Sequence, residues 1–126
     1  MFKKTLCLDF DGVIHGYQSG WKGAAVIPDP PVPGTKKAIE KLRETWKVVV
    51  YSSRSGQEGG KAAMQAWLDQ HGIEVDELAD HKPPAVIYVD DRGVTFNGNW
   101  QDCLESINNF KHWQAPKPQP LPSEDV

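Results

Sequence analysis

The sequence predicts an α/β domain built on a parallel sheet, and two observations lead to that prediction. Three apolar runs, at roughly residues 4–9, 47–52 and 86–90, are continuous rather than alternating. Continuous runs are expected of strands that are covered on both faces, as in a parallel sheet. Segments with helical periodicity follow these runs, and an alternation of strands with helices is typical of parallel α/β folds.

Helical periodicity defines three further elements, in residues 35–46, 60–71 and 100–113. In each of them the apolar side chains share one face, which is the pattern of a helix that packs on a core. Gly72 follows the second segment, at a position where glycine commonly ends a helix. A short strand is expected at residues 73–75.

Two segments do not fit the alternation of strands and helices. Residues 13–33 form a long connection rich in glycine and proline, and a loop of this length within a compact domain is usually functional. We expect residues 13–15 and 24–27 to pair as a short hairpin that folds over the strand ends as a flap. In residues 115–126 proline alternates with other residues, which favours an extended, solvated chain. The chain is therefore divided into a domain of residues 1–114 and a disordered, proline-rich tail.

Length and composition limit the class of protein to which this chain can belong. A chain of 126 residues is expected to form one domain. Its apolar fraction of 39% and charged fraction of 25% are ordinary for a soluble protein, and no apolar run approaches the roughly 20 residues of a membrane span. The first strand follows the N-terminus directly and ends in the candidate site described next. A cleaved signal peptide would remove that site, so we expect a cytoplasmic protein.

Four aspartates stand at the ends of two predicted strands. Asp9 and Asp11 follow the first run, and Asp90 and Asp91 follow the last. Ligands of parallel sheets bind beyond the carboxyl ends of the strands, and a cluster of like charges there requires a cation or a chemical task. Carboxylate oxygens suit Mg²⁺, so we predict a Mg²⁺ site formed by Asp9, the backbone carbonyl near Asp11, and Asp90 or Asp91. An Asp-Asp pair considered alone is more often a solvated turn or a helix cap, and its place after an apolar run, together with Asp9 and Asp11, favours the metal site.

The first two aspartates also predict a reaction. A carboxylate such as Asp9 can attack phosphorus and form an aspartyl-phosphate, which divides a hydrolysis into two easier displacements. Asp11 can protonate the leaving group and then deprotonate the attacking water. Gly12 allows the tight turn by which the chain leaves the strand.

Candidate phosphate contacts follow the middle strand and precede the last one. Ser52 can donate a hydrogen bond to a phosphoryl oxygen, a role for which Ser53 competes, and Arg54 can hold a second oxygen or a neighbouring phosphate. Lys82 would neutralise the charge of the carboxylates and the phosphoryl group. The simpler interpretations are a helix-capping loop for the serines and a solvated lysine.

Three more residues are candidates for substrate contacts. His15 lies near the acids in sequence and either touches substrate or is a structural histidine. Trp21 either stacks on a base or fills the predicted hairpin. Arg92 either pairs with Asp90 or Asp91 or reaches the substrate.

Four motifs, taken in order, resemble the signature motifs of the haloacid dehalogenase superfamily. They lie at residues 9–14, 51–54, 82 and 89–92, and the resemblance covers about residues 4–112. It implies a Rossmann-like three-layer sandwich with a mostly parallel sheet, an aspartyl-phosphate intermediate and Mg²⁺. No large cap domain is expected. In response-regulator receiver domains the lysine follows the acidic pair, whereas here it precedes it.

An aspartate two residues after the nucleophile is typical of the phosphatases and phosphotransferases of this superfamily. A looser likeness to the 3′-phosphatase domain of polynucleotide kinase suggests a nucleotide or a nucleic-acid end phosphate as the substrate. No Gly-x-x-x-x-Gly-Lys-Ser/Thr motif for kinase activity occurs. A sugar phosphate phosphatase, and a non-catalytic relative that binds phosphate or a protein, are the alternatives. The sequence leaves the oligomeric state open.

Overall fold

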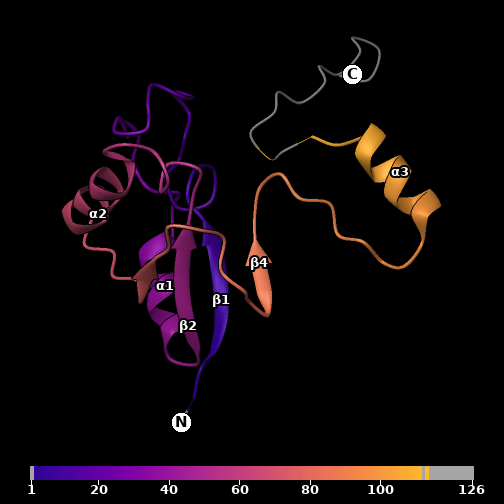
Figure 1. Cartoon of the computed structure of the whole chain (residues 1–126), viewed down its shortest axis with the longest axis horizontal. Coiled ribbons are helices and arrows are strands. Elements are labelled where there is room, and N and C mark those ends of the chain that lie inside the picture. Colours follow the sequence, from indigo (N-terminus) through magenta and orange to yellow (C-terminus); the bar gives the residue numbers. More distant parts are fainter. Residues whose placement is uncertain (1, 112, 114–126) are drawn as a thin grey trace, which may run out of the picture. The chain divides into compact units, whose positions relative to one another are not determined.

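A computed structural model describes residues 2–111 and 113. The chain divides into two compact units, Met1–Asp91 and Arg92–Val126. The first unit contains the sheet and two helices, and the described residues of the second form one helix (Figure 1). In chain order the elements are β1 (Lys4–Asp9), α1 (Thr35–Arg43), β2 (Trp46–Tyr51), α2 (Gly60–Gln70), β3 (Glu77–Leu78), β4 (Ile87–Val89) and α3 (Trp100–Asn108).

The sheet is four-stranded and entirely parallel, in the order β3-β2-β1-β4. This confirms the predicted Rossmann-like α/β class. The register pairs Asp9 of β1 with Tyr51 of β2, and Leu8 of β1 with Val89 of β4. The carboxyl ends of these three strands therefore lie at the same edge, which brings the segments after residues 9, 51 and 89 together.

The two helices of this unit cover one face of the sheet. Leu8 of β1 and Val50 of β2 join a buried cluster with Ile39 of α1 and with Met64 and Leu68 of α2. Burial of these side chains is the main stabilising contribution to the unit, because each removes an aliphatic surface from water.

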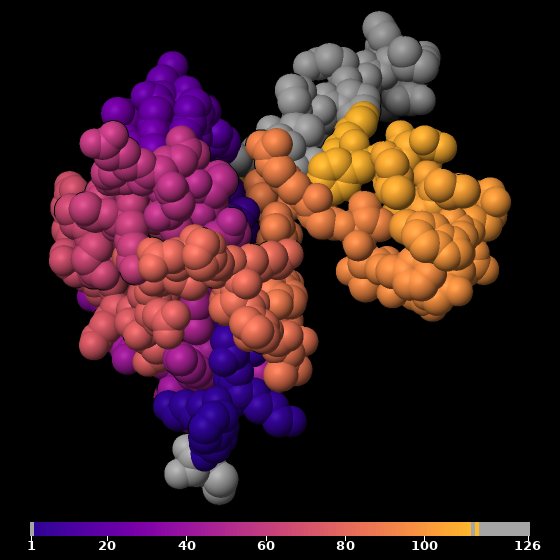
Figure 2. Space-filling view, viewed as in Figure 1, coloured from indigo at the N-terminus to yellow at the C-terminus, as the bar shows by residue number. Residues whose placement is uncertain are grey.

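The segment between β3 and β4 crosses the other face of the sheet (Figure 1). In the space-filling view it lies on the surface of the sheet unit (Figure 2). Two strand residues, Cys7 of β1 and Val49 of β2, are only 4% and 1% exposed on the face that this segment covers. Lys82, on the crossing segment, lines the same hollow as Cys7. The crossing segment thus carries the lysine to the carboxyl edge of the sheet.

The last strand is less covered than its apolar sequence predicts. Ile87, Tyr88 and Val89 are each exposed, whereas the central residues of β1 and β2 are buried. Position in the sheet explains the contrast, because β4 is an edge strand and has only β1 as a neighbour.

The third strand lies at Glu77–Leu78 rather than at the predicted residues 73–75. Gly72 adopts a positive φ of 65° and ends α2. The Ile73 N–H then donates to the Leu68 carbonyl, which is a helix-terminating pattern. Ile73 is therefore buried as part of the helix end, and pairing with β2 begins only after it.

The predicted hairpin of residues 13–15 with 24–27 does not form. His15 pairs instead with Pro31 in an isolated antiparallel bridge. The carbonyls of Gly23, Ala24 and Val26 accept hydrogen bonds from the Arg54 side chain. A side chain far away in sequence thus satisfies the polar groups that a partner strand would have satisfied.

Helix α3 begins at a capped residue, because the side chain of Asn99 accepts a hydrogen bond from the Asp102 N–H. None of its residues is buried. The proline-rich tail predicted for residues 115–126 lies outside the described residues. Within the described part of the chain, no helix has the length and apolar character needed to cross a membrane.

Candidate active site

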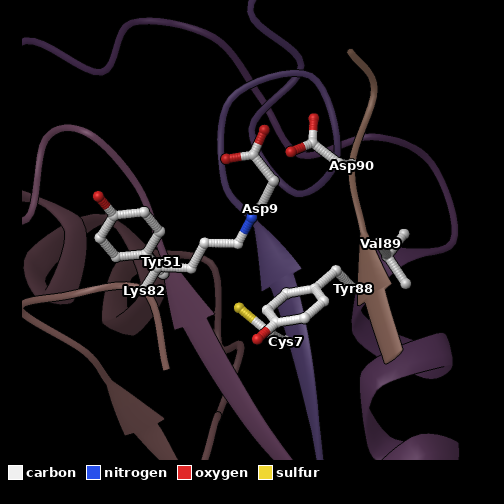
Figure 3. A pocket seen from close by; sticks show the side chains of 7 residues that line it. All are labelled: Cys7, Asp9, Tyr51, Lys82, Tyr88, Val89 and Asp90. Carbon is white, nitrogen blue, oxygen red and sulfur yellow. The ribbon is translucent and has the colours of Figure 1, made fainter. Parts of the chain in front are cut away.

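Three of the four predicted acids meet at the carboxyl edge of the sheet. Carboxylate oxygens of Asp9, Asp90 and Asp91 all lie within 4.8 Å of one another. Figure 3 shows the carboxylates of Asp9 and Asp90 at the ends of neighbouring strands, close to each other. The parallel register explains the meeting, because Leu8 pairs with Val89 and the next residue of each strand is an aspartate.

Burial and the neighbouring acids together raise the pKa of Asp9 to about 7. Burial is the largest cause, and the charges of Asp90, Asp91 and Asp11 act in the same direction, while a backbone hydrogen bond at Phe10 opposes them. Ionised Asp9 therefore needs compensation by a positive charge. Three converging carboxylates fit Mg²⁺, which prefers oxygen ligands. The carboxylate of Asp11 is not part of this group, and a metal contact through its backbone carbonyl stays a prediction.

Gly12 makes the approach of Asp91 possible. Its φ of +82° lies in the left-handed region, and a Cβ added to it would stand 2.2 Å from Oδ2 of Asp91. Any other residue here would be strained and would displace that carboxylate. The predicted turn glycine therefore also shapes the acidic cluster.

Lys82 joins the site from the crossing segment. With Asp9 and Asp90 it lines a hollow whose other walls are Cys7, Tyr51, Tyr88 and Val89. Its ammonium lies 4.6 Å from the centroid of the Tyr88 ring and points towards the end of β1 (Figure 3). Burial, opposed by the Lys82 charge, raises the pKa of the Cys7 thiol, which favours a protonated, unreactive cysteine.

The two serines differ in their surroundings. Ser52 is buried, and its Oγ accepts a hydrogen bond from the Arg54 N–H at 3.1 Å. A hydroxyl both donates and accepts, so this contact still leaves Ser52 a proton to donate. Ser53 is exposed, and its carbonyl accepts from Nε2 of Gln57. The phosphate-binding role stays a prediction for both.

Arg54 is completely buried and its guanidinium is largely engaged within the protein. Nε donates to both oxygens of Asp11, at 3.1 and 2.9 Å. Nη1 donates to the carbonyls of Gly23, Ala24 and Val26 at 2.8–3.1 Å. The contact of Arg54 with phosphate also stays a prediction, since Nη2 is the one guanidinium nitrogen that has no hydrogen-bond partner among the described residues.

Trp21 lies against Arg54. The Cζ atom of the arginine stands 4.6 Å from the centroid of the indole ring, which is a cation–π geometry. The ring remains 46% exposed. Trp21 thus covers a buried cation and still presents surface to solvent.

His15 is buried in the core and contacts Asp11. Its Nε2 accepts a hydrogen bond from the Asp29 N–H at 3.1 Å, so we assign the ring proton to Nδ1, which donates to Oδ1 of Asp11 at 2.8 Å. The ring also packs against Phe10 and Trp67, with centroids 5.7 and 5.6 Å away. Of the two roles left open by the sequence, these contacts favour the structural one.

Sequence reasoning missed Asp29, which positions His15, and the carbonyls of residues 23, 24 and 26, which bind Arg54. Main-chain carbonyls have no sequence signature. Arg92 belongs to the second unit, and its role stays a prediction. Comparison with protein-family models, with curated proteins and with solved structures finds no match to this chain.

Proposed function

We propose that the protein is a Mg²⁺-dependent phosphomonoester hydrolase that acts through an aspartyl-phosphate at Asp9. The observation that carries this proposal is the convergence of Asp9, Asp90 and Asp91 within 4.8 Å at the carboxyl edge of a parallel sheet. The reaction also needs a proton donor and a cation, and Asp11 and Lys82 are available for these tasks at the same edge.

The proposed reaction has two displacement steps, and Asp11 acts as an acid in the first and as a base in the second. An ionised oxygen of Asp9 attacks phosphorus, the bond from phosphorus to the ester oxygen breaks, and that oxygen takes a proton from Asp11. In the second step Asp11 removes a proton from water, the water oxygen attacks phosphorus, and Asp9 is released with inorganic phosphate. Lys82 and Ser52 would hold phosphoryl oxygens. A bound Mg²⁺ supplies charge neutralisation and orientation of the phosphoryl group.

The order of the motifs supports this reaction class over the alternatives. The acidic pair, the serine-arginine segment, the lysine and the second acidic pair occur in the order of the haloacid dehalogenase motifs. A non-catalytic phosphate-binding or protein-binding relative would not need both Asp9 and Asp11. A glycosyltransferase with an Asp-x-Asp motif would leave the later residues unexplained.

The substrate that we favour is a nucleotide or a nucleic-acid end phosphate, and a 3′-phosphate end is the leading candidate. Trp21 is a half-exposed aromatic ring beside Arg54, and an aromatic surface can stack on a base. Apart from the four acids of the site the chain is nearly neutral, so recognition would be confined to the end of the strand. A sugar phosphate is the alternative substrate.

A hydrolysis panel tests the proposal. It contains p-nitrophenyl phosphate, 3′- and 5′-nucleotides, oligonucleotides with a 3′- or 5′-phosphate, sugar phosphates and a phosphopeptide, each with Mg²⁺ and with EDTA. We expect Mg²⁺-dependent release of phosphate that Asp9→Asn abolishes. Asp69→Asn is the matched control, because Asp69 is an exposed residue of α2 that hydrogen-bonds Gln65.

Two results would contradict the proposal. Retention of substantial activity by Asp9→Asn would exclude the covalent step, and an inactive wild type across the panel would exclude the phosphatase. If 3′-phosphorylated oligonucleotides are hydrolysed no better than sugar phosphates, the nucleic-acid substrate is wrong.

A further inference from the structure

We propose that Arg54 is a positioning residue, which holds the carboxylate of Asp11 and the loop above it rather than the substrate phosphate. The catalytic consequence rests on the proposed function, whereas the attachment of the loop does not. The inference follows from the partners of Nε and Nη1, the two guanidinium nitrogens that form hydrogen bonds among the described residues.

The first contact fixes Asp11. Arg54 is 0% exposed, and a buried charge requires a counter-charge and hydrogen bonds. Its Nε donates to both carboxylate oxygens of Asp11, at 3.1 and 2.9 Å. In the ionised form that removes a proton from water, Asp11 serves as the counter-ion, and the orientation of its carboxyl group depends on that of the guanidinium.

The second contact fixes the loop. Nη1 lies within 2.8–3.1 Å of the carbonyl oxygens of Gly23, Ala24 and Val26, and Trp21 lies over Cζ. Only arginine has donors in a planar fork that can bind a carboxylate and a set of carbonyls at once. A lysine would reach one of the two groups.

His15 holds Asp11 from the other side. Nδ1 donates to Oδ1 of Asp11 at 2.8 Å, and Nε2 accepts from the backbone of Asp29. Both partners of the Asp11 carboxylate are thus bound to the loop of residues 21–29. A proton donor must stand at a defined distance from the leaving oxygen, and small displacements are costly to the rate. The loop and Arg54 together would set that distance.

Limited proteolysis by trypsin tests whether Arg54 holds the loop, and it requires no assay of activity. Lys22 is exposed and immediately precedes Gly23, whose carbonyl binds Arg54. In Arg54→Met we expect trypsin to cleave after Lys22 at least tenfold faster than in wild type, as followed by the mass of the fragment 1–22. Arg54→Lys should be cleaved at an intermediate rate. This variant replaces Arg54→Met in the comparison if the methionine variant does not fold.

The matched control is Arg43→Met, which removes another arginine from an ion pair. Arg43 binds Asp76 near the opposite end of the sheet, so the cleavage after Lys22 should keep its wild-type rate. Unchanged cleavage in both Arg54 variants, or equal acceleration by Arg43→Met, would overturn the attachment of the loop.

A leaving-group comparison tests the positioning of Asp11. Phenyl phosphate and p-nitrophenyl phosphate have similar shapes, but p-nitrophenolate is a stable anion that leaves without a proton. We expect Arg54→Lys to lower kcat/KM for phenyl phosphate at least tenfold more than for p-nitrophenyl phosphate, with unchanged inhibition by inorganic phosphate. An equal loss on both substrates, with or without weaker inhibition by phosphate, would overturn the positioning role. If wild type hydrolyses neither substrate, the proposed function fails, and the trypsin experiment still decides whether Arg54 holds the loop.

Discussion

Replacing the predicted nucleophile should stabilise the metal-free protein at neutral pH. The perturbation is Asp9→Asn, which keeps the shape of the side chain and removes its charge. The pKa of Asp9 is raised from 3.8 to about 7 by burial and by its acidic neighbours. Well below pH 3.8 the residue is protonated in both the folded and the unfolded protein, so it has no effect on the pH dependence there.

Between pH 3.8 and pH 7, the pKa values of Asp9 in the unfolded and the folded protein, the unfolded chain releases the proton of Asp9 and the folded protein retains it. The free energy of unfolding of wild type therefore falls by about 1.4 kcal/mol for each pH unit. By pH 7 the accumulated loss is about 4 kcal/mol, because the pKa changes by roughly three units. The asparagine variant lacks this loss.

Urea unfolding in EDTA, at several values between pH 4 and pH 8, measures the effect. The difference between the variant and wild type reports the charge of Asp9 together with its repulsion from the neighbouring acids, because carboxylates that do not interact with Asp9 titrate alike in both proteins. We expect Asp9→Asn to be more stable at pH 8 and the difference to disappear towards pH 4. A difference that does not vary with pH, or a variant that is less stable at pH 8, would refute the electrostatic argument.

Three further predictions concern the cation site and the sheet. Mg²⁺ should raise the melting temperature of wild type by mass action, and Asp90→Ala should remove most of that rise; an unchanged rise would assign the metal to Asp91. Gly12→Ala should weaken Mg²⁺ binding about tenfold or more in calorimetry, because its Cβ would meet the Asp91 carboxylate. Gly20→Ala is the control, since Gly20 has a similar φ of +72° and no atom within 4 Å of its added Cβ; equal effects of the two variants would contradict this reasoning. Burial raises the pKa of Asp76, but hydrogen bonds to a strand amide and an arginine outweigh it and hold the pKa below 3.8. Asp76 should therefore stabilise the fold above pH 4 and lose that effect as the pH falls further, so the stability difference from Asp76→Asn, measured by urea unfolding, should shrink in acid.

The sequence by itself determined the fold class and the position of the acidic cluster. Continuous apolar runs and amphipathic periodicity are local properties, and they predicted β1, β2, β4, α1 and α2 to within three residues, whereas α3 ends at Asn108, five residues before the predicted end. The meeting of Asp9 with Asp90 and Asp91 followed from the same pattern, because aspartates at the ends of parallel strands share one edge.

Only the tertiary structure decided what the loop of residues 13–33 does. Its carbonyls could have paired with each other in a hairpin, and the sequence favours that local solution. They bind Arg54 instead, and Arg54 also binds Asp11, 43 residues away in the chain. Local periodicity carries no information about hydrogen bonds between a side chain and a distant main chain. These contacts, which the sequence does not indicate, are the basis of the proposal that the arginine positions Asp11.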